Sequence, residues 1–183
     1  HLEQLLSSVA SSLTRMISAS NCYIFSVDDK RNLLYGVASD QRGDAIRKVE
    51  IKLNENTLAP LAVRERRPLA VENAPQDPRV SKKWIETFKS RSLLAVPLII
   101  KERVIGVVLL DETRYFRQFT PEEIEKVGAL ANQVAVAIEN ATLYQAVTKH
   151  MERLQTLSSA IVNIQEEERR RIAQELHDEA GQA

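Results

Sequence analysis

The spacing of hydrophobic residues divides the chain into segments with different secondary structure. Apolar residues recur at helical spacing from Leu2 to Ile17, which predicts an amphipathic helix at the start of the chain. The segments 21–28 and 33–39 are instead rich in aromatic and β-branched residues, and the polar turn 29–32 separates them. This pattern predicts a β-hairpin directly after the first helix.

The middle of the chain predicts shorter elements joined by loops. Residues 48–53 alternate in polarity and predict a third, more exposed strand, and residues 57–66 predict a short helix. A brief strand over 69–71 follows, and the composition of 73–79 indicates a loop. Ser81 then has the position of an N-cap for a short helix.

The two most apolar runs of the chain are residues 93–100 and 104–110. They are nearly continuous in Leu, Ile and Val, so they predict central strands with both faces covered. Pro97 lies inside the first of these runs. Proline has no N–H to donate, so we expect a bulge or an unpaired position there.

The segment Thr120-Pro-Glu-Glu123 has the residues of a helix start: an N-cap, a first-turn proline and a capping-box glutamate. Neither glycine nor proline occurs from Ala129 to Ala180, so nothing predicts where this helix would end. Six apolar residues keep a spacing of three and four along it, namely Val147, Met151, Leu154, Leu157, Ile161 and Ile164. This spacing favours a parallel two-stranded coiled coil, with a disordered linker as the alternative. The charges of residues 166–171 interrupt the stripe.

Composition narrows the class of protein. The 183 residues include 25 basic and 25 acidic side chains, which argues against a partner that is nucleic acid or an anionic membrane surface. No apolar run is long enough to span a bilayer, so we expect no membrane contact in this segment. Cys22 is the only cysteine, which excludes an internal disulfide and fits a cytoplasmic location. A membrane anchor of the parent protein would then lie upstream.

One histidine stands out by its neighbours. His177 directly precedes Asp178 and lies on the same predicted helix as Gln182. A neutral imidazole nitrogen is a good nucleophile near neutral pH, and an adjacent carboxylate can orient the ring and stabilise the charge that develops on it. Asp178 and Gln182 are four residues apart, so they share a helix face, and an amide there could orient an attacking water. The alternative is an ordinary exposed histidine in a Glu/Arg-rich helix.

The segment from Glu168 to Gln182 resembles the phosphoacceptor box of two-component sensor histidine kinases, specifically the subfamily that signals to response regulators of the nitrate-response type. The resemblance implies that His177 is the phosphorylated residue and Asp178 its acid/base partner. It also implies that Gln182 orients water for phosphatase activity. Residues 169–183 would be the first part of the dimerisation and phosphoacceptor domain, truncated before its second helix.

A glycine-rich loop that could hold nucleotide phosphates is missing, since no two of the five glycines are near each other. The resemblance implies that the full-length protein is a protein-histidine kinase that uses ATP and Mg²⁺. Because this fragment has no loop for the nucleotide, we expect it to be inactive alone. The implied partners are a second copy of the chain, as a homodimer, and a response regulator.

Three further segments resemble a GAF domain: residues 92–98, the strand 104–111 and residues 119–123, together with the loop Asp77-Pro-Arg79. The likeness covers residues 1–145, and residues 146–168 would be a coiled-coil signalling helix. It implies an α+β fold with a six-stranded antiparallel sheet and helices on both faces. The first and last helices would pack together on one face, and loops on the other face would shelter a small ligand.

The sequence limits the class of ligand for such a pocket only by excluding several cofactors. No histidine lies between Leu2 and Lys149, and Cys22 is a lone thiol at a strand start, so we expect no haem, bilin, iron–sulfur cluster or other metal. Cys22 reads as a small buried hydrophobe. A small polar or anionic ligand remains, with four arginines on or beside the pocket loops as candidates and solvated surface charges as the alternative: Arg79, Arg91, Arg114 and Arg117.

The sequence is compatible with three candidate functions. The first is the signal-input and phosphoacceptor part of a histidine kinase. The second is a non-enzymatic GAF scaffold for ligand binding or dimerisation, in which His177 is unused. The third is a transcription regulator with a GAF sensor, for which the chain offers neither a helix-turn-helix pattern nor a basic patch.

Overall fold

A computed structural model describes the backbone of residues 2–180 and the side chains of residues 3–174. The chain divides into two compact units, His1–Glu139 and Asn140–Ala183. The first unit contains the sheet and its flanking helices, and the second consists of the continuation of helix α5, which runs from Pro121 to Ala180. Within the part of the chain that the structure describes, no helix is long and apolar enough to span a membrane.

The first unit is built on one antiparallel sheet of six strands in the order β3-β2-β1-β6-β5-β4. The strands β1 and β6 therefore lie at the centre and pair with each other from Asn21 opposite Asp111 to Ser26 opposite Gly106. The strand bounds are Asn21–Asp28 for β1, Leu33–Ser39 for β2, Glu50–Lys52 for β3, Leu69–Val71 for β4, Ser92–Ile100 for β5 and Arg103–Glu112 for β6.

Side chains alternate between two separate cores on the two faces of this sheet. In β1, Cys22 and Ile24 join one core, whereas Tyr23 and Phe25 join the other. The strand β6 alternates in the same way, because Leu109 lies in the core of Tyr23 and Leu110 in that of Cys22. Both faces of the central strands are thus buried, as their apolar sequence predicts.

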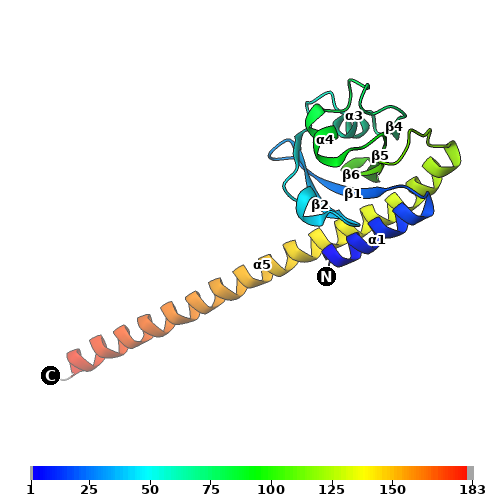
Figure 1. Ribbon diagram of the computed structural model, residues 1–183. Helices are drawn as coiled ribbons and strands as arrows, with labels where there is room; N and C mark the ends of the chain where they lie inside the picture. The colour runs from blue at the N-terminus through cyan, green and yellow to red at the C-terminus, as the bar shows by residue number, and fades with distance from the viewer. Residues whose placement is uncertain (1, 181–183) are drawn as a thin grey trace. The chain divides into compact units, whose positions relative to one another are not determined.

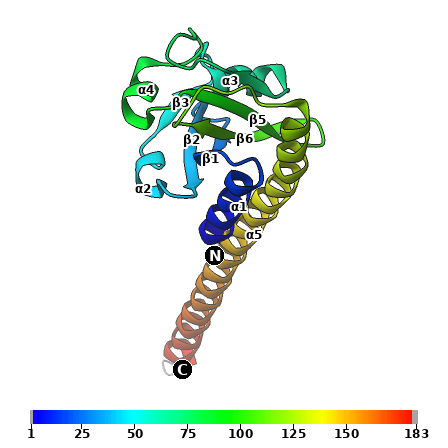
Figure 2. The same cartoon turned by 45° about the vertical axis from the view of Figure 1, so that its right-hand side comes forward.

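Helix α1, Leu2–Met16, and the first part of α5 cover one face of the sheet. Figures 1 and 2 both show these two helices side by side beneath the strands. Their apolar residues form a single buried cluster with the sheet, to which α1 contributes Leu6, Ala10 and Leu13 and α5 contributes Val127, Ala131, Val134, Ala135 and Ile138. Of the apolar residues that predicted this helix, Leu6, Leu13 and Ile17 are buried, whereas Leu5 and Met16 are exposed.

The opposite face carries three shorter helices and the loops between them: α2, Gly43–Ile46, α3, Leu58–Glu65, and α4, Lys82–Phe88. Ser81 caps α4, since its hydroxyl oxygen accepts a hydrogen bond from the backbone N–H of Trp84 at 3.2 Å. Helix α3 packs its buried residues against the sheet between β4 and β6. This layer is where the sequence predicted loops and short helices.

Most elements agree with the sequence prediction. The hairpin, the strand 69–71, the cap at Ser81 and the capping box at Thr120 are all confirmed. The third strand is shorter than predicted, and α2 was not predicted. Pro97 pairs with Val107, and the bulge lies just beyond it, between Leu98 and Ile99. Proline is tolerated here because β4 pairs with β5 only from Leu93 to Ala95, which leaves Pro97 on an edge.

Candidate functional site

A cavity of about 630 Å³ lies on the sheet face that carries α3 and α4. The β strands form its floor through Leu93 and Leu109, and its sides come from the α2–β3 segment, the start of α3 and one face of α4. A cavity of this size suits a small organic molecule, which binding sites of this kind enclose with apolar walls and a few polar groups.

The apolar wall is formed by an aromatic cluster. Trp84 and Phe88 lie one turn apart on α4 and stack with their ring centroids 4.1 Å apart. Tyr23 meets both rings edge-on from β1, at 5.4 Å from Trp84 and 5.0 Å from Phe88. Such contacts fix the orientation of the rings, so the wall is formed before any ligand binds.

Two polar side chains of the lining, Arg79 and Thr57, differ in whether they have hydrogen-bond partners within the protein. The guanidinium of Arg79 donates to both carboxylate oxygens of Asp77, at 2.9 and 2.7 Å. This hydrogen bonding lowers the pKa of Asp77 and fixes the arginine side chain. The hydroxyl oxygen of Thr57, at the N-cap of α3, is buried and has no hydrogen-bond partner among the described residues. A buried hydroxyl without a partner is uncommon and marks a place where a ligand or water can bind.

The charged side chains around the cavity leave positive charge available. Glu50 is paired with Arg31 at 2.9 Å, and Glu55 accepts a hydrogen bond from the backbone N–H of Lys52. The ammonium groups of Lys48 and Lys83, by contrast, form no ion pair with any described residue. The rim therefore favours an anionic group on the ligand.

Comparison with known proteins places this architecture in a family. Residues 1–138 match the GAF domain. The chain belongs to the GAF domain family. No curated protein sequence is significantly similar to it.

Solved structures of GAF domains share the fold at low sequence identity. The GAF domain of a phosphoenolpyruvate-protein phosphotransferase from Coxiella burnetii is 23% identical, with a TM-score of 0.73 over 80% of this chain and 87% of that one. The free methionine-R-sulfoxide reductase from Neisseria meningitidis is 19% identical, with a TM-score of 0.66 over 79% of this chain and 81% of that one. The second GAF domain of DevS from Mycobacterium smegmatis is 20% identical, with a TM-score of 0.63 over 80% and 99%. At these identities the likeness concerns the fold.

Of the four arginines proposed from the sequence, only Arg79 lines the cavity of this GAF domain. Arg91 lies over the ring of Phe116 instead, 5.3 Å from its centroid. Arg114 and Arg117 instead donate to the carbonyl oxygens of Ser18 and Ile17, in the loop after α1. The sequence analysis missed Lys48, Lys83 and Thr57, because no local pattern distinguishes them from surface residues.

Cys22 is fully buried in the core beneath α1. Burial, together with the nearby carboxylates of Asp40 and Asp111, raises the pKa of its thiol well above the ordinary value. A thiol in this state is neutral and packs as a small apolar side chain. The prediction for Cys22 is confirmed.

Among the described residues, no group of three or more His, Cys, Asp or Glu side chains is placed to hold a metal ion.

The end of β6 carries two adjacent buried carboxylates. Asp111 extends toward the aromatic cluster, where it accepts hydrogen bonds from Asn21, Tyr23 and Ser90 at 2.8, 3.2 and 2.7 Å. Burial raises the pKa of Asp111, and these hydrogen bonds oppose the shift. Asp111 is therefore held by neutral donors, all of them within the GAF fold.

Glu112 has an ionic partner on the other side of the strand. It accepts hydrogen bonds from Ser20 at 2.6 Å and from the guanidinium of Arg114 at 2.7 and 2.8 Å. Burial by itself raises the pKa of Glu112, but these donors outweigh it and lower the pKa to about 2. Arg114 also donates to the carbonyl oxygen of Ser18, so this pair ties β6 to the end of α1.

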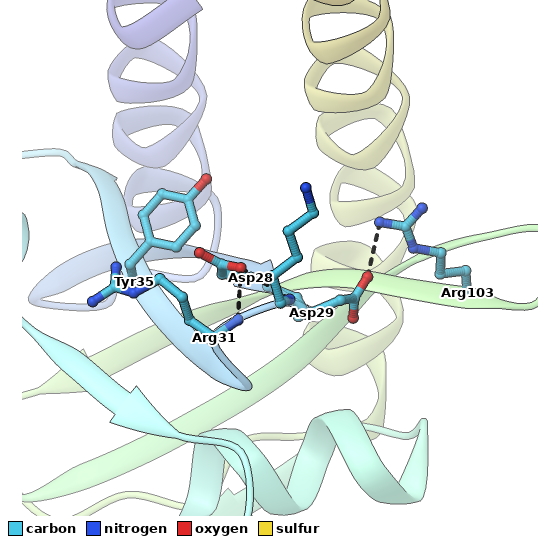
Figure 3. Close-up of a pocket in the computed structure, with 7 residues that line it drawn as sticks. Asp28, Asp29, Arg31, Tyr35 and Arg103 are labelled. Carbon is cyan, nitrogen blue, oxygen red and sulfur yellow. Dashed lines mark hydrogen bonds and ion pairs between the residues drawn. The ribbon is translucent and has the colours of Figure 1, made fainter.

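A second, more open hollow of about 360 Å³ lies at the β1–β2 turn (Figure 3). Most of its charged side chains already have partners within the protein. Asp29 pairs with Arg103 at 3.2 Å, and Asp28 accepts hydrogen bonds from the backbone N–H groups of Lys30 and Arg31. Figure 3 shows the guanidinium of Arg103 directed at the carboxylate of Asp29, and Asp28 beside the backbone of Arg31. We therefore assign the candidate site to the cavity beside α4.

The residues of the phosphoacceptor box lie in the second unit. The backbone of His177 and Asp178 is helical, within α5, but their side chains are outside the described residues. Gln182 is outside the described residues altogether. Their roles stay predictions from the sequence.

The stability of the GAF domain should depend on pH through Glu112. Its pKa is lower in the folded chain than its ordinary value of 4.5, so its contribution is complete above that pH and is lost as the pH falls toward 2. Glu112→Gln should lower the free energy of unfolding at pH 7 by about 3 kcal/mol and by much less at pH 2.5. Urea denaturation at both pH values measures this. Equal differences at the two pH values would contradict the assignment.

Proposed function

We propose that this chain is the signal-input and phosphoacceptor segment of a two-component sensor histidine kinase. The observation that carries the proposal is the string from Glu168 to Gln182, which resembles the phosphoacceptor box of that class. Its support is the helix α5, which starts in the core of the GAF domain and continues without a break to Ala180. One helix thus joins the sensor fold to the box.

In this function His177 attacks the terminal phosphate of ATP held by a separate catalytic domain. The bond from the phosphorus to the leaving oxygen breaks, and ADP departs. The carboxylate of Asp178 accepts a hydrogen bond from the other ring nitrogen and stabilises the positive charge that develops on the ring. The phosphoryl group then passes from His177 to an aspartate of a response regulator. In the phosphatase reaction, Gln182 orients the water that hydrolyses this aspartyl phosphate and releases inorganic phosphate. The alternative is a GAF scaffold that binds a ligand or dimerises without using His177.

Phosphorylation separates these two functions. The chain is mixed with the catalytic domain of a histidine kinase and ATP labelled in its terminal phosphate. We expect label on the wild-type chain, and a loss of at least ten-fold in His177→Gln because the nucleophile is removed. His150→Gln is the control, since it also removes one histidine of the same helix. His150 falls on a d position of the heptad register given below, and glutamine keeps a polar side chain there, so this variant should keep both the dimer and the label. Equal label on all three chains, or none on the wild type, would favour the scaffold.

Dimerisation through α5 is the second part of the proposal. Val147, Leu154 and Ile161 fall on the a positions of one heptad register, and Leu143, Leu157 and Ile164 on its d positions. All six are more than half exposed in the single chain, at 56, 66, 56, 58, 60 and 64%. Large apolar residues at this spacing are stable in water only when a partner covers them, and a second copy supplies an identical stripe.

The register offers a sharp test of this dimer. Leu157→Lys introduces a charge at a d position, whereas Ser159→Lys introduces the same charge two residues on, at the outward f position. We expect light scattering to give twice the 20.7 kDa chain mass for the wild type and for Ser159→Lys, and the mass of one chain for Leu157→Lys. A dimer that survives Leu157→Lys would place the contact in the GAF domain instead.

The cavity is the proposed input site, and its lining points to the class of ligand. The stacked Trp84 and Phe88 favour a flat apolar body, while the unpaired Lys48 and Lys83 favour an acidic group at the rim. The hydroxyl of Thr57 offers one further hydrogen bond at the start of α3. We propose a small aromatic or aliphatic molecule that carries a carboxylate, sulfonate or phosphate.

Trp84 is the only tryptophan of the chain, so its fluorescence reports directly on this cavity. We expect 1-anilinonaphthalene-8-sulfonate to quench it and to bind more tightly than N-phenyl-1-naphthylamine, which lacks the acidic group. Lys83→Gln should weaken binding of the sulfonate about five-fold, while Lys82→Gln, its neighbour outside the lining, should not. Equal affinity for both probes, or no quenching, would contradict the proposed ligand class.

A further inference from the structure

We infer that a buried chain of hydrogen bonds through Trp84, Ser90 and Asp111 couples the cavity to the end of α1 and the start of α5. The inference rests on the proposed role of the cavity as the input site. These hydrogen bonds provide the route by which occupancy of the cavity affects the helices on the opposite face of the sheet.

The first link joins the cavity wall to the sheet. The indole N–H of Trp84 donates to the hydroxyl oxygen of Ser90 at 3.0 Å, and that hydroxyl donates to a carboxylate oxygen of Asp111 at 2.7 Å. Trp84 lines the cavity, whereas Ser90 and Asp111 are completely buried. The hydroxyl of Ser90 thus uses its one proton for Asp111 and a lone pair for Trp84.

The second link crosses the sheet. Asp111 and Glu112 are consecutive residues of a strand, so their side chains extend to opposite faces. The contacts agree: Asp111 bonds to Tyr23 and Ser90 on the cavity side, and Glu112 bonds to Ser20 and Arg114 beside α1. A rotation of this one peptide unit therefore changes hydrogen bonds in both layers.

The third link joins this peptide to the loop after α1. The backbone N–H of Ser20 donates to the carbonyl oxygen of Asp111 at 2.8 Å. The hydroxyl of Ser20 donates to Glu112 and accepts from the backbone N–H of Thr113 at 3.0 Å. Asn21, directly after Ser20, donates to the carboxylate of Asp111. Ser20, the last residue of this loop, and Asn21, the first residue of β1, are thus bound to the two carboxylate-bearing residues of β6.

The fourth link reaches α5. Arg117 donates to the carbonyl oxygen of Ile17 at 2.9 Å and forms an ion pair with Glu123 in the first turn of α5. Glu123 also accepts from the backbone N–H of Thr120 at 2.8 Å and so completes the N-cap of the helix. Only 13% of the Arg117 side chain is exposed, so water screens this pair little. A shift of the loop after α1 therefore moves Arg117 and changes the contacts at the start of α5.

Burial is what makes the chain a coupling element. A buried donor or acceptor that loses its partner is costly, so a ligand that turns the indole of Trp84 away from Ser90 leaves an unsatisfied hydroxyl unless the next groups move as well. Spatial continuity alone does not establish coupling, so the test must measure the response at the far end.

The test is native-state hydrogen exchange on the full chain without ligand. Trp84→Phe removes the indole donor but keeps an aromatic ring in the wall. Phe88→Leu is the matched control, because it changes the ring stacked on Trp84 but leaves Trp84, Ser90 and Asp111 in place. Trp84→Phe should speed exchange of the Ser20 and Thr113 amides about ten-fold more than exchange of the amides that pair β2 with β3. Phe88→Leu should change both groups of amides alike.

A uniform change in Trp84→Phe, equal to that in Phe88→Leu, would overturn the inference. Ser90→Ala provides a second variant and should show the same local effect, provided that it folds. Since no ligand is present, the result is independent of the probe titration of the cavity. If hydrogen exchange changes as expected but the protein binds no probe, the coupling is supported and the proposed ligand site is contradicted.

Discussion

Burial of two adjacent carboxylates at the end of β6 is the constraint around which this GAF domain is organised. Asp111 and Glu112 are both inaccessible to solvent, and a buried carboxylate is tolerated only when hydrogen bonds replace its water. The chain meets this requirement from several separate segments: Ser20 and Asn21 before and at the start of β1, Tyr23 within it, Ser90 before β5 and Arg114 after β6. Each donor fixes the end of one element to the central strand, so the requirement sets the arrangement of the layers.

The two faces of the sheet have different physical characters as a result. The face beneath α1 and α5 is a continuous apolar core in which even the thiol of Cys22 is neutral and packed. The other face has a wall of stacked aromatic rings and is hollow beside it. A densely packed apolar core resists deformation, whereas a cavity with unpaired lysines at its rim can accept a molecule. The division suits a fold that receives a ligand on one face and holds helices on the other.

The helix α5 belongs to both parts of the proposed function. Its first turns are capped by Thr120 and Glu123 and buried against the sheet. Beyond Glu139 its large apolar residues are exposed in the single chain, in a heptad pattern that a second copy would cover. In the proposed function, the continuous backbone of α5 links the GAF domain to the segment that a second copy would cover.

Sequence alone determined those features that depend on neighbours in the chain. The ends of β1, β2 and β4, the caps at Ser81 and Thr120 and the burial of both faces of β5 and β6 follow from local propensity, capping chemistry and alternation. The short helix α2 was missed because four residues are too few to show a helical period. The string around His177 is local as well, which is why it could be read without the fold.

The candidate site was decided by the tertiary structure. Lys48, Thr57 and Lys83 lie in different segments and become neighbours of one cavity only when α2, α3 and α4 pack on the same face of the sheet. Arg114 and Arg117 were candidates by their place in a loop, yet the fold directs both toward the loop after α1, where they satisfy Glu112, Glu123 and two carbonyl groups. Which charges remain unpaired depends on contacts between residues far apart in sequence, and no local pattern carries that information.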